Sequence, residues 1–153
     1  MIADALSLQQ SRVGTQTGLT DWVTIDQARI DAFADITEDP QWIHTDPQRA
    51  AAETPFGGTI AHGFLTLSMA SKFSIEVLGK LPGQTMGINY GFNKIRFLSP
   101  VCEGDQIRGR FVLNSVTQKS DTTLLSASNL TIEITGKETP ALIAEWLGMA
   151  VFS

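Results

Sequence analysis

The stretch that decides the fold is FLTLSMASKFSIEVLG, residues 64–79, in which only Lys72 and Glu76 carry charge. These two residues are four apart in the sequence, so they lie on one face of a helix. A helix that is apolar around most of its circumference is buried on most sides. The stretch therefore predicts a central helix over residues 64–78, covered by the rest of the chain.

After this helix the pattern changes to that of β-strands. The segments are rich in aromatic and β-branched side chains or alternate between apolar and polar residues, and turn signals separate them. A buried helix followed by consecutive antiparallel strands predicts an α+β fold, a sheet wrapped around one helix. The predicted strands are residues 86–98, 106–118, 122–135 and 141–152.

Two further helices are expected before the central one. Thr24 and Gln27 have the spacing of a capping box, so a helix should begin there, and Pro40 prevents it from running further. Asp46-Pro47 combines an N-cap aspartate with proline at the first helical position, which predicts the start of a second, short helix. The polar stretch between the two helices is expected to form no element of its own.

The length and composition indicate one globular domain, since the chain has 153 residues of which 42% are hydrophobic and 18% charged. Residues 1–18 are expected to form a loosely ordered arm, and residues 19–153 the folded domain. A net charge of −5 with no basic cluster argues against a nucleic-acid binder.

The single cysteine, Cys102, excludes an internal disulfide and leaves no ligand set for a structural zinc. The first residues lack the order of a secretory signal, and no apolar run approaches the ~20 residues of a membrane helix. We therefore expect a soluble protein of the cytoplasm.

The candidate catalytic residues flank the predicted central helix. Asp39 and His44 are five apart across a turn that contains proline, so both can point at one small volume. A carboxylate beside an imidazole can hold a water molecule and move its protons near neutral pH. The spacing also fits an aspartate that only caps a turn and a histidine that is an ordinary satisfied polar residue.

His62-Gly63 directly precedes the central helix, where unpaired backbone amides can polarise a carbonyl. Glycine would let a substrate approach these amides closely, although it also fits a residue needed only for the turn. Trp42 is a candidate for the wall of an acyl pocket, or for ordinary packing.

Together these residues resemble the MaoC-like dehydratases, a family that includes the R-specific enoyl-CoA hydratases. The family signature GDxNPxH corresponds to EDPQWIH at residues 38–44, where Gln and Trp replace Asn-Pro and Glu replaces Gly without loss of a catalytic atom. IAHGFLTLS (60–68), INYGFNKIRFLSPV (88–101) and the Gly104-Asp105 turn also resemble the family in order and spacing. The resemblance covers about residues 20–152. The form that the signature takes here, QWIH followed by FGGTIAHGFLTLS, is similar to that of the branch containing nodulation-protein-N-like hydratases.

The resemblance implies a hotdog fold, with a long central helix wrapped by a curved antiparallel sheet, and a homodimer formed through sheet edges. It implies that Asp39 and His44 activate the water that adds to C3 of a trans-2-enoyl thioester, giving the (R)-3-hydroxyacyl thioester reversibly. Gly63 N–H would bind the thioester carbonyl, and Ser71 would supply a supporting hydrogen bond near the aspartate. No metal or redox cofactor is implied, because CoA or acyl carrier protein carries the acyl chain.

Two alternative functions stay open. A hotdog acyl-CoA thioesterase commonly has a catalytic carboxylate in or near the central helix, where this chain offers only Glu76. A non-catalytic acyl-binding hotdog subunit would be expected to lose Asp39 or His44, and this chain keeps both.

Overall fold

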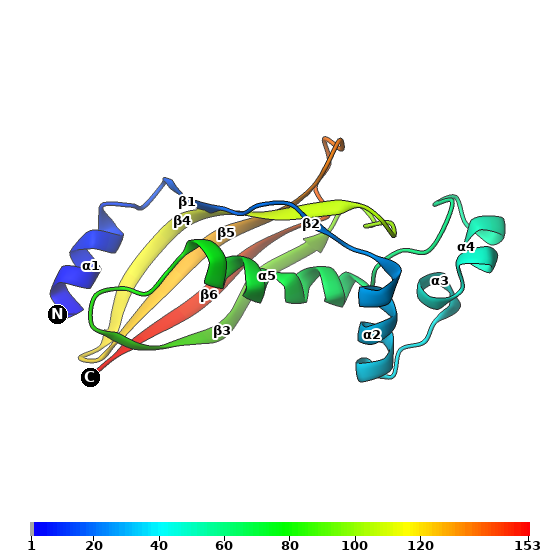
Figure 1. Ribbon diagram of the computed structural model, residues 1–153. Helices are drawn as coiled ribbons and strands as arrows, with labels where there is room; N and C mark the ends of the chain where they lie inside the picture. The colour runs from blue at the N-terminus through cyan, green and yellow to red at the C-terminus, as the bar shows by residue number, and fades with distance from the viewer. Residues whose placement is uncertain (1) are drawn as a thin grey trace.

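The computed structural model describes residues 2–153, and its strands form one antiparallel six-stranded sheet that curves around a central helix (Figure 1). The sheet order is β1-β4-β5-β6-β3, with β2 also paired to β4. No helix in this described range is both long and apolar enough to cross a membrane. The elements are α1 (Ile2–Gln10), β1 (Gln16–Leu19), β2 (Val23–Thr24), α2 (Gln27–Thr37), α3 (Trp42–Thr45), α4 (Pro47–Glu53), α5 (Gly63–Val77), β3 (Gln84–Phe97), β4 (Gln106–Ser120), β5 (Thr123–Ile134) and β6 (Leu142–Phe152).

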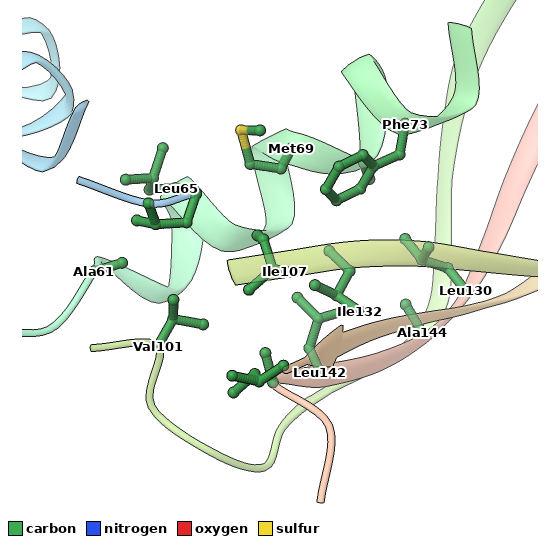
Figure 2. Packing of buried hydrophobic residues seen from close by; sticks show 14 of the residues in the cluster. Ala61, Leu65, Met69, Phe73, Val101, Ile107, Leu130, Ile132, Leu142 and Ala144 are labelled. Carbon is green, nitrogen blue, oxygen red and sulfur yellow. The ribbon is translucent and has the colours of Figure 1, made fainter. Parts of the chain in front are cut away.

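The core lies between α5 and the concave face of the sheet. Leu65, Met69 and Phe73 are buried and recur every four residues, so one face of α5 is apolar along its length (Figure 2). They pack in one cluster with inward-facing strand residues such as Ile107. Gly109 permits a close approach of α5 to the sheet, since a Cβ there would lie 2.9 Å from Cδ2 of Phe73.

This architecture confirms the predicted α+β fold and the hotdog arrangement of one long helix wrapped by an antiparallel sheet (Figure 1). The central helix and the four long strands all form where the sequence predicts them, to within about two residues at each end. α2, α3 and α4 gather beyond the end of the sheet at which α5 begins, and this is the end that holds the candidate catalytic residues.

The predicted start of α2 was wrong in its capping residue. The N-cap is Asp26, whose side chain accepts a hydrogen bond from the Arg29 amide at 2.9 Å. Thr24 cannot serve because it is paired with Gln106 in the β2–β4 ladder. The second predicted cap is confirmed, since the Asp46 side chain accepts from the Arg49 amide at 3.0 Å and α4 follows.

Two segments expected to lack regular structure have it. Residues 2–10 form α1, because fully buried Ala5 anchors this helix in a small apolar cluster with Val116, Leu124 and Phe152. β1 then pairs with β4, so the expected loosely ordered arm over residues 1–18 is largely regular, while Met1 lies outside the described residues. The polar stretch after α2 contains the single turn α3.

Candidate active site

Asp39 lies immediately after a tightly closed end of α2. The helix ends at Thr37, and Glu38 follows in the left-handed conformation, with φ 56° and ψ 35°. The Asp39 amide then donates to the carbonyl of Ala34 at 3.0 Å, which satisfies one of the last helical carbonyls. This turn leaves the Asp39 carboxylate at the surface, with 55% of its side chain exposed.

His44 is carried by α3 and is buried, in contrast to Asp39. Its Nδ1 lies 2.6 Å from the carbonyl oxygen of Ile60. Because a carbonyl only accepts, Nδ1 carries the ring proton and Nε2 keeps its lone pair when the ring is neutral. The backbone of His44 is fixed as well, since its carbonyl accepts from Nε2 of Gln27 at 2.7 Å.

The electrostatic environment favours the neutral form of His44. Burial lowers the pKa of His44 below its ordinary value, and the nearby His62 adds to this effect. The hydrogen bond to the Ile60 carbonyl and the charge of Asp39 act in the opposite direction without reversing it. A neutral imidazole with a free Nε2 lone pair can act as a general base.

His62 connects the aspartate and the other histidine. It is the N-cap residue of α5 and only 3% exposed, and its ring is stacked on that of His44 with centroids 3.7 Å apart. Its Nε2–H donates to the backbone carbonyl of Asp39 at 3.0 Å and lies 3.9 Å from Oδ2 of the same residue. The structure thus brings Asp39, His44 and His62 into one cluster.

Gly63 places the amide end of α5 directly after this cluster. The first amides of a helix have no intrahelical partner and carry partial positive charge, so they can stabilise a developing negative charge. Gly63 does not have a positive φ, so its backbone conformation does not by itself require glycine. The space beside it is tight, since a Cβ at this position would lie 3.2 Å from two ring carbons of Phe97.

The same three side chains meet the distance requirement for a metal site, with one donor atom of each within 4.8 Å of the others. Metal-bound imidazoles direct their in-plane lone pairs at the ion. The rings of His44 and His62 are stacked with an angle of 24° between their planes, so their in-plane lone pairs do not converge. The geometry suits an acid–base group better than a chelate.

The two remaining predicted site residues lie apart from this cluster. Trp42 begins α3 and has the guanidinium of Arg49 4.2 Å above its ring. Ser71 is eight residues beyond Gly63 on α5, a separation of about 12 Å along the helix. It lines a groove of about 690 Å³ between α5 and the strands, and Trp42 does not line this groove. Other groove residues include Leu67, Ser74, Ile88, Trp146 and Met149.

The fold is that of a hotdog protein, and the Asp39–His44–His62 cluster lies at the start of its central helix. The MaoC like domain family model matches residues 9–134. The chain therefore belongs to the MaoC-like dehydratase family, as the resemblance in the sequence predicted.

Individual relatives support this assignment. The chain is 50% identical over 149 residues to Nodulation protein N of Rhizobium meliloti, covering 97% of this chain and 92% of that protein. It is 43% identical over 132 residues to 3-hydroxyacyl-thioester dehydratase Z of Mycobacterium tuberculosis, covering 86% of each. Among solved structures, the (R)-hydratase from A. caviae involved in PHA biosynthesis has a TM-score of 0.72 and 26% identity, with 89% of this chain and 94% of that one covered.

The contacts that hold the pair together were not predicted from the sequence. The sequence marks His62 as one of two histidines that flank the central helix and as the neighbour of Gly63, and it marks Gln27 as a capping residue. In the structure the Gln27 side chain bonds to both the His44 carbonyl and the Thr59 hydroxyl. The one available signal was that both histidines of the chain flank the central helix.

Proposed function

We propose that this protein is an enoyl-thioester hydratase that reversibly adds water to a trans-2-enoyl thioester to give the (R)-3-hydroxyacyl thioester. The observation that carries the proposal is the geometry of His44, a buried imidazole with Nδ1 bonded to the Ile60 carbonyl and Nε2 free, clustered with the Asp39 carboxylate. The names of two relatives, a 3-hydroxyacyl-thioester dehydratase and an (R)-hydratase, support the reaction class and its stereochemistry.

In this mechanism a water molecule is held between the Asp39 carboxylate and Nε2 of His44. Its hydroxyl adds to C3 of the enoyl group, one of its protons passes to the pair, and a proton is delivered to C2. Negative charge develops on the thioester oxygen, which the Gly63 amide stabilises by a hydrogen bond. No atom is left over, since the elements of one water are added across the C2–C3 double bond.

A thioesterase that uses Glu76 is disfavoured by the contacts of that residue. The Glu76 carboxylate accepts from Nζ of Lys72 at 2.8 Å and from the Asp21 amide at 3.1 Å. These hydrogen bonds, that of Lys72 first, lower the pKa of Glu76. An ionised carboxylate already engaged in a structural ion pair is poorly suited to act as a nucleophile or base.

One assay separates the candidate functions. Crotonyl-CoA is mixed with the protein while the absorbance of its enoyl group and the free thiol are followed separately. Hydration lowers the absorbance without releasing thiol, whereas hydrolysis releases thiol. A non-catalytic acyl-binding subunit changes neither signal. Thiol release at the rate of substrate loss, or no change in either signal, would contradict the proposal.

We also propose a homodimer formed through β3. Within residues 2–153 this strand lies at the sheet edge and pairs only with β6. An unpaired edge has to be covered or protected, and Met86, Ile88 and Tyr90 leave 52%, 38% and 49% of their surface exposed on it. Sedimentation should show a dimer, and a stable monomer at micromolar concentration would contradict this. The cytoplasmic location, and CoA or acyl carrier protein as the carrier, stay predictions.

A further inference from the structure

We propose that His62 is a positioning residue for the Asp39–His44 pair, with two separable roles: its Nε2–H fixes the turn that carries Asp39, and its ring covers His44. The catalytic consequence of this inference rests on the proposed hydratase function, whereas both contacts can be tested without substrate.

The first role concerns Asp39. Its carboxylate is half exposed, so burial does not hold it in place, and its position follows from its backbone. The backbone carbonyl of Asp39 accepts the Nε2–H of His62, a residue 23 positions away in the sequence. Because His62 is also the residue before Gly63, one side chain ties the aspartate turn to the amide end of α5.

The second role concerns His44. The stacked His62 ring lies 3.7 Å from that of His44 and shields one of its faces from water. Two titratable groups act on His44: Asp39 from the turn after α2, and His62 from the start of α5. Since burial is the main cause of the lowered pKa of His44, loss of the covering ring should raise that pKa toward its ordinary value.

A purely structural role does not explain why a histidine occupies this position. Nδ1 of His62 is buried and, within the described residues, has no hydrogen-bond partner. An unpaired buried acceptor is destabilising, and an apolar ring of similar size would avoid this cost. The Phe33 ring, 5.0 Å away, already makes the surroundings suitable for such a ring. The histidine is therefore explained by its hydrogen bond to the Asp39 turn rather than by packing.

Two substitutions separate the two roles. His62→Phe keeps an aromatic ring against His44 but removes the donor to the Asp39 carbonyl. His62→Gln keeps an N–H donor but removes the ring. Thr66→Val is the matched control, because Thr66 is buried one turn further along α5 and its hydroxyl donates to the His62 carbonyl, at 3.4 Å.

The test combines NMR titration of His44, followed by long-range ¹H–¹⁵N spectra without substrate, with thermal unfolding and crotonyl-CoA kinetics. For His62→Phe we expect a His44 pKa that rises less than in His62→Gln, because the covering ring stays and only the electrostatic effect of His62 is lost. We also expect a Tm near wild type, an unchanged KM, and a kcat lowered toward the ~100-fold that a misplacement of about 1 Å can cost. For His62→Gln we expect His44 to titrate at higher pH, and the acid limb of kcat/KM to move with it. Thr66→Val should match wild type in both readouts.

Two outcomes overturn the inference. One is a folded His62→Phe protein with wild-type kcat, and the other is a folded His62→Gln protein with an unshifted His44 titration. If one variant fails to fold, the other still tests one role: His62→Phe tests the hydrogen bond to Asp39, and His62→Gln tests the cover over His44. If wild type itself does not hydrate crotonyl-CoA, the proposed function fails, whereas the substrate-free titration of His44 still tests the contact with His62.

Discussion

The two ends of α5 differ in how firmly the side chains around them are held in place. We call the N-terminal end the fixed end and the C-terminal end the open end. At the N-terminal end, both histidines are buried, and each uses one ring nitrogen in a hydrogen bond to a backbone carbonyl. Toward the C-terminal end, Ser71 and Ile75 line an open groove, and Ile75 is 79% exposed. The candidate catalytic cluster therefore lies where hydrogen bonds to the backbone hold both imidazoles, whereas the C-terminal half of α5 borders an open groove.

The largest expected effect tests the fixed end. Asp39→Asn and His44→Ala should each lower kcat by about 10²–10⁴-fold, the usual contribution of an acid–base group. In the double variant the loss of kcat should be smaller than the product of the two single losses, because the two residues act on one water molecule. Steady-state kinetics on crotonyl-CoA, with unfolding curves as the control for folding, check this. Near-wild-type turnover in either folded single variant would contradict the assignment.

Gly63→Val should have the next largest effect, a fall in kcat of about 10²–10³-fold for every acyl chain length, as for a lost oxyanion donor. The added side chain would displace the substrate carbonyl from the amide end of α5. It would also press on Phe97, whose ring carbons lie 3.2 Å from the Cβ position. The kinetics should therefore be compared with those of Gly63→Val combined with Phe97→Ala, which relieves this contact. Full recovery in the double variant would show that crowding, not the amide, caused the loss.

The elements that the sequence predicts well are those whose signal is local. The central helix and the long strands follow from apolar periodicity, and Asp46-Pro47 marks the start of α4 by its own chemistry. Thr24 and Asp26 are both good capping residues, and only the pairing of Thr24 with a distant strand decides between them. α1 was likewise missed because its stability depends on the sheet that buries Ala5.

The features of the candidate site also differ in whether their sequence signal is local. The spacing of Asp39 and His44 marks a candidate pair, and the family resemblance strengthens it, because both signals lie within one short segment. The contacts from His62 to the Asp39 carbonyl and from Gln27 to the His44 carbonyl join residues 23 and 17 positions apart. No periodicity or local motif encodes such contacts, so they appear only once the chain is folded.

The pH dependence sharpens the description of the fixed end. In the proposed mechanism His44 acts as a base in the hydration direction, so kcat/KM should fall as pH drops through its pKa. Burial lowers this pKa, so activity should persist to a pH below the ordinary value of about 6.5 for an exposed histidine. A pH profile from 4.5 to 8 tests this, and an acid limb above that ordinary value would show that His44 is not the desolvated base.

A smaller effect is expected at the open end. Ser71→Ala should lower kcat by at most about ten-fold, as expected for one neutral hydrogen bond. Ser71→Phe would partly fill the groove and should reduce turnover of long enoyl-CoAs more than that of crotonyl-CoA. A panel of C4 to C16 substrates measures both effects. An Asp39-like loss in Ser71→Ala at all lengths would instead place the Ser71 hydroxyl in the acid–base chemistry itself, beyond the supporting hydrogen bond that the family resemblance implies.

The smallest expected effect concerns Glu38, where the family signature has glycine. Glu38 is the one non-glycine residue with a positive φ in the described chain, and this conformation disfavours a side chain. Glu38→Gly should therefore raise the free energy of unfolding by about 0.5–1 kcal/mol, partly offset by the greater freedom of glycine in the unfolded chain. Glu38→Ala is the control, because it removes the charge but keeps the Cβ. Urea denaturation should show the glycine variant as the more stable of the two, and equal midpoints would contradict the argument. Turnover should stay near wild type in both variants, because the carbonyl of Asp39 remains bonded to His62 whichever residue precedes it.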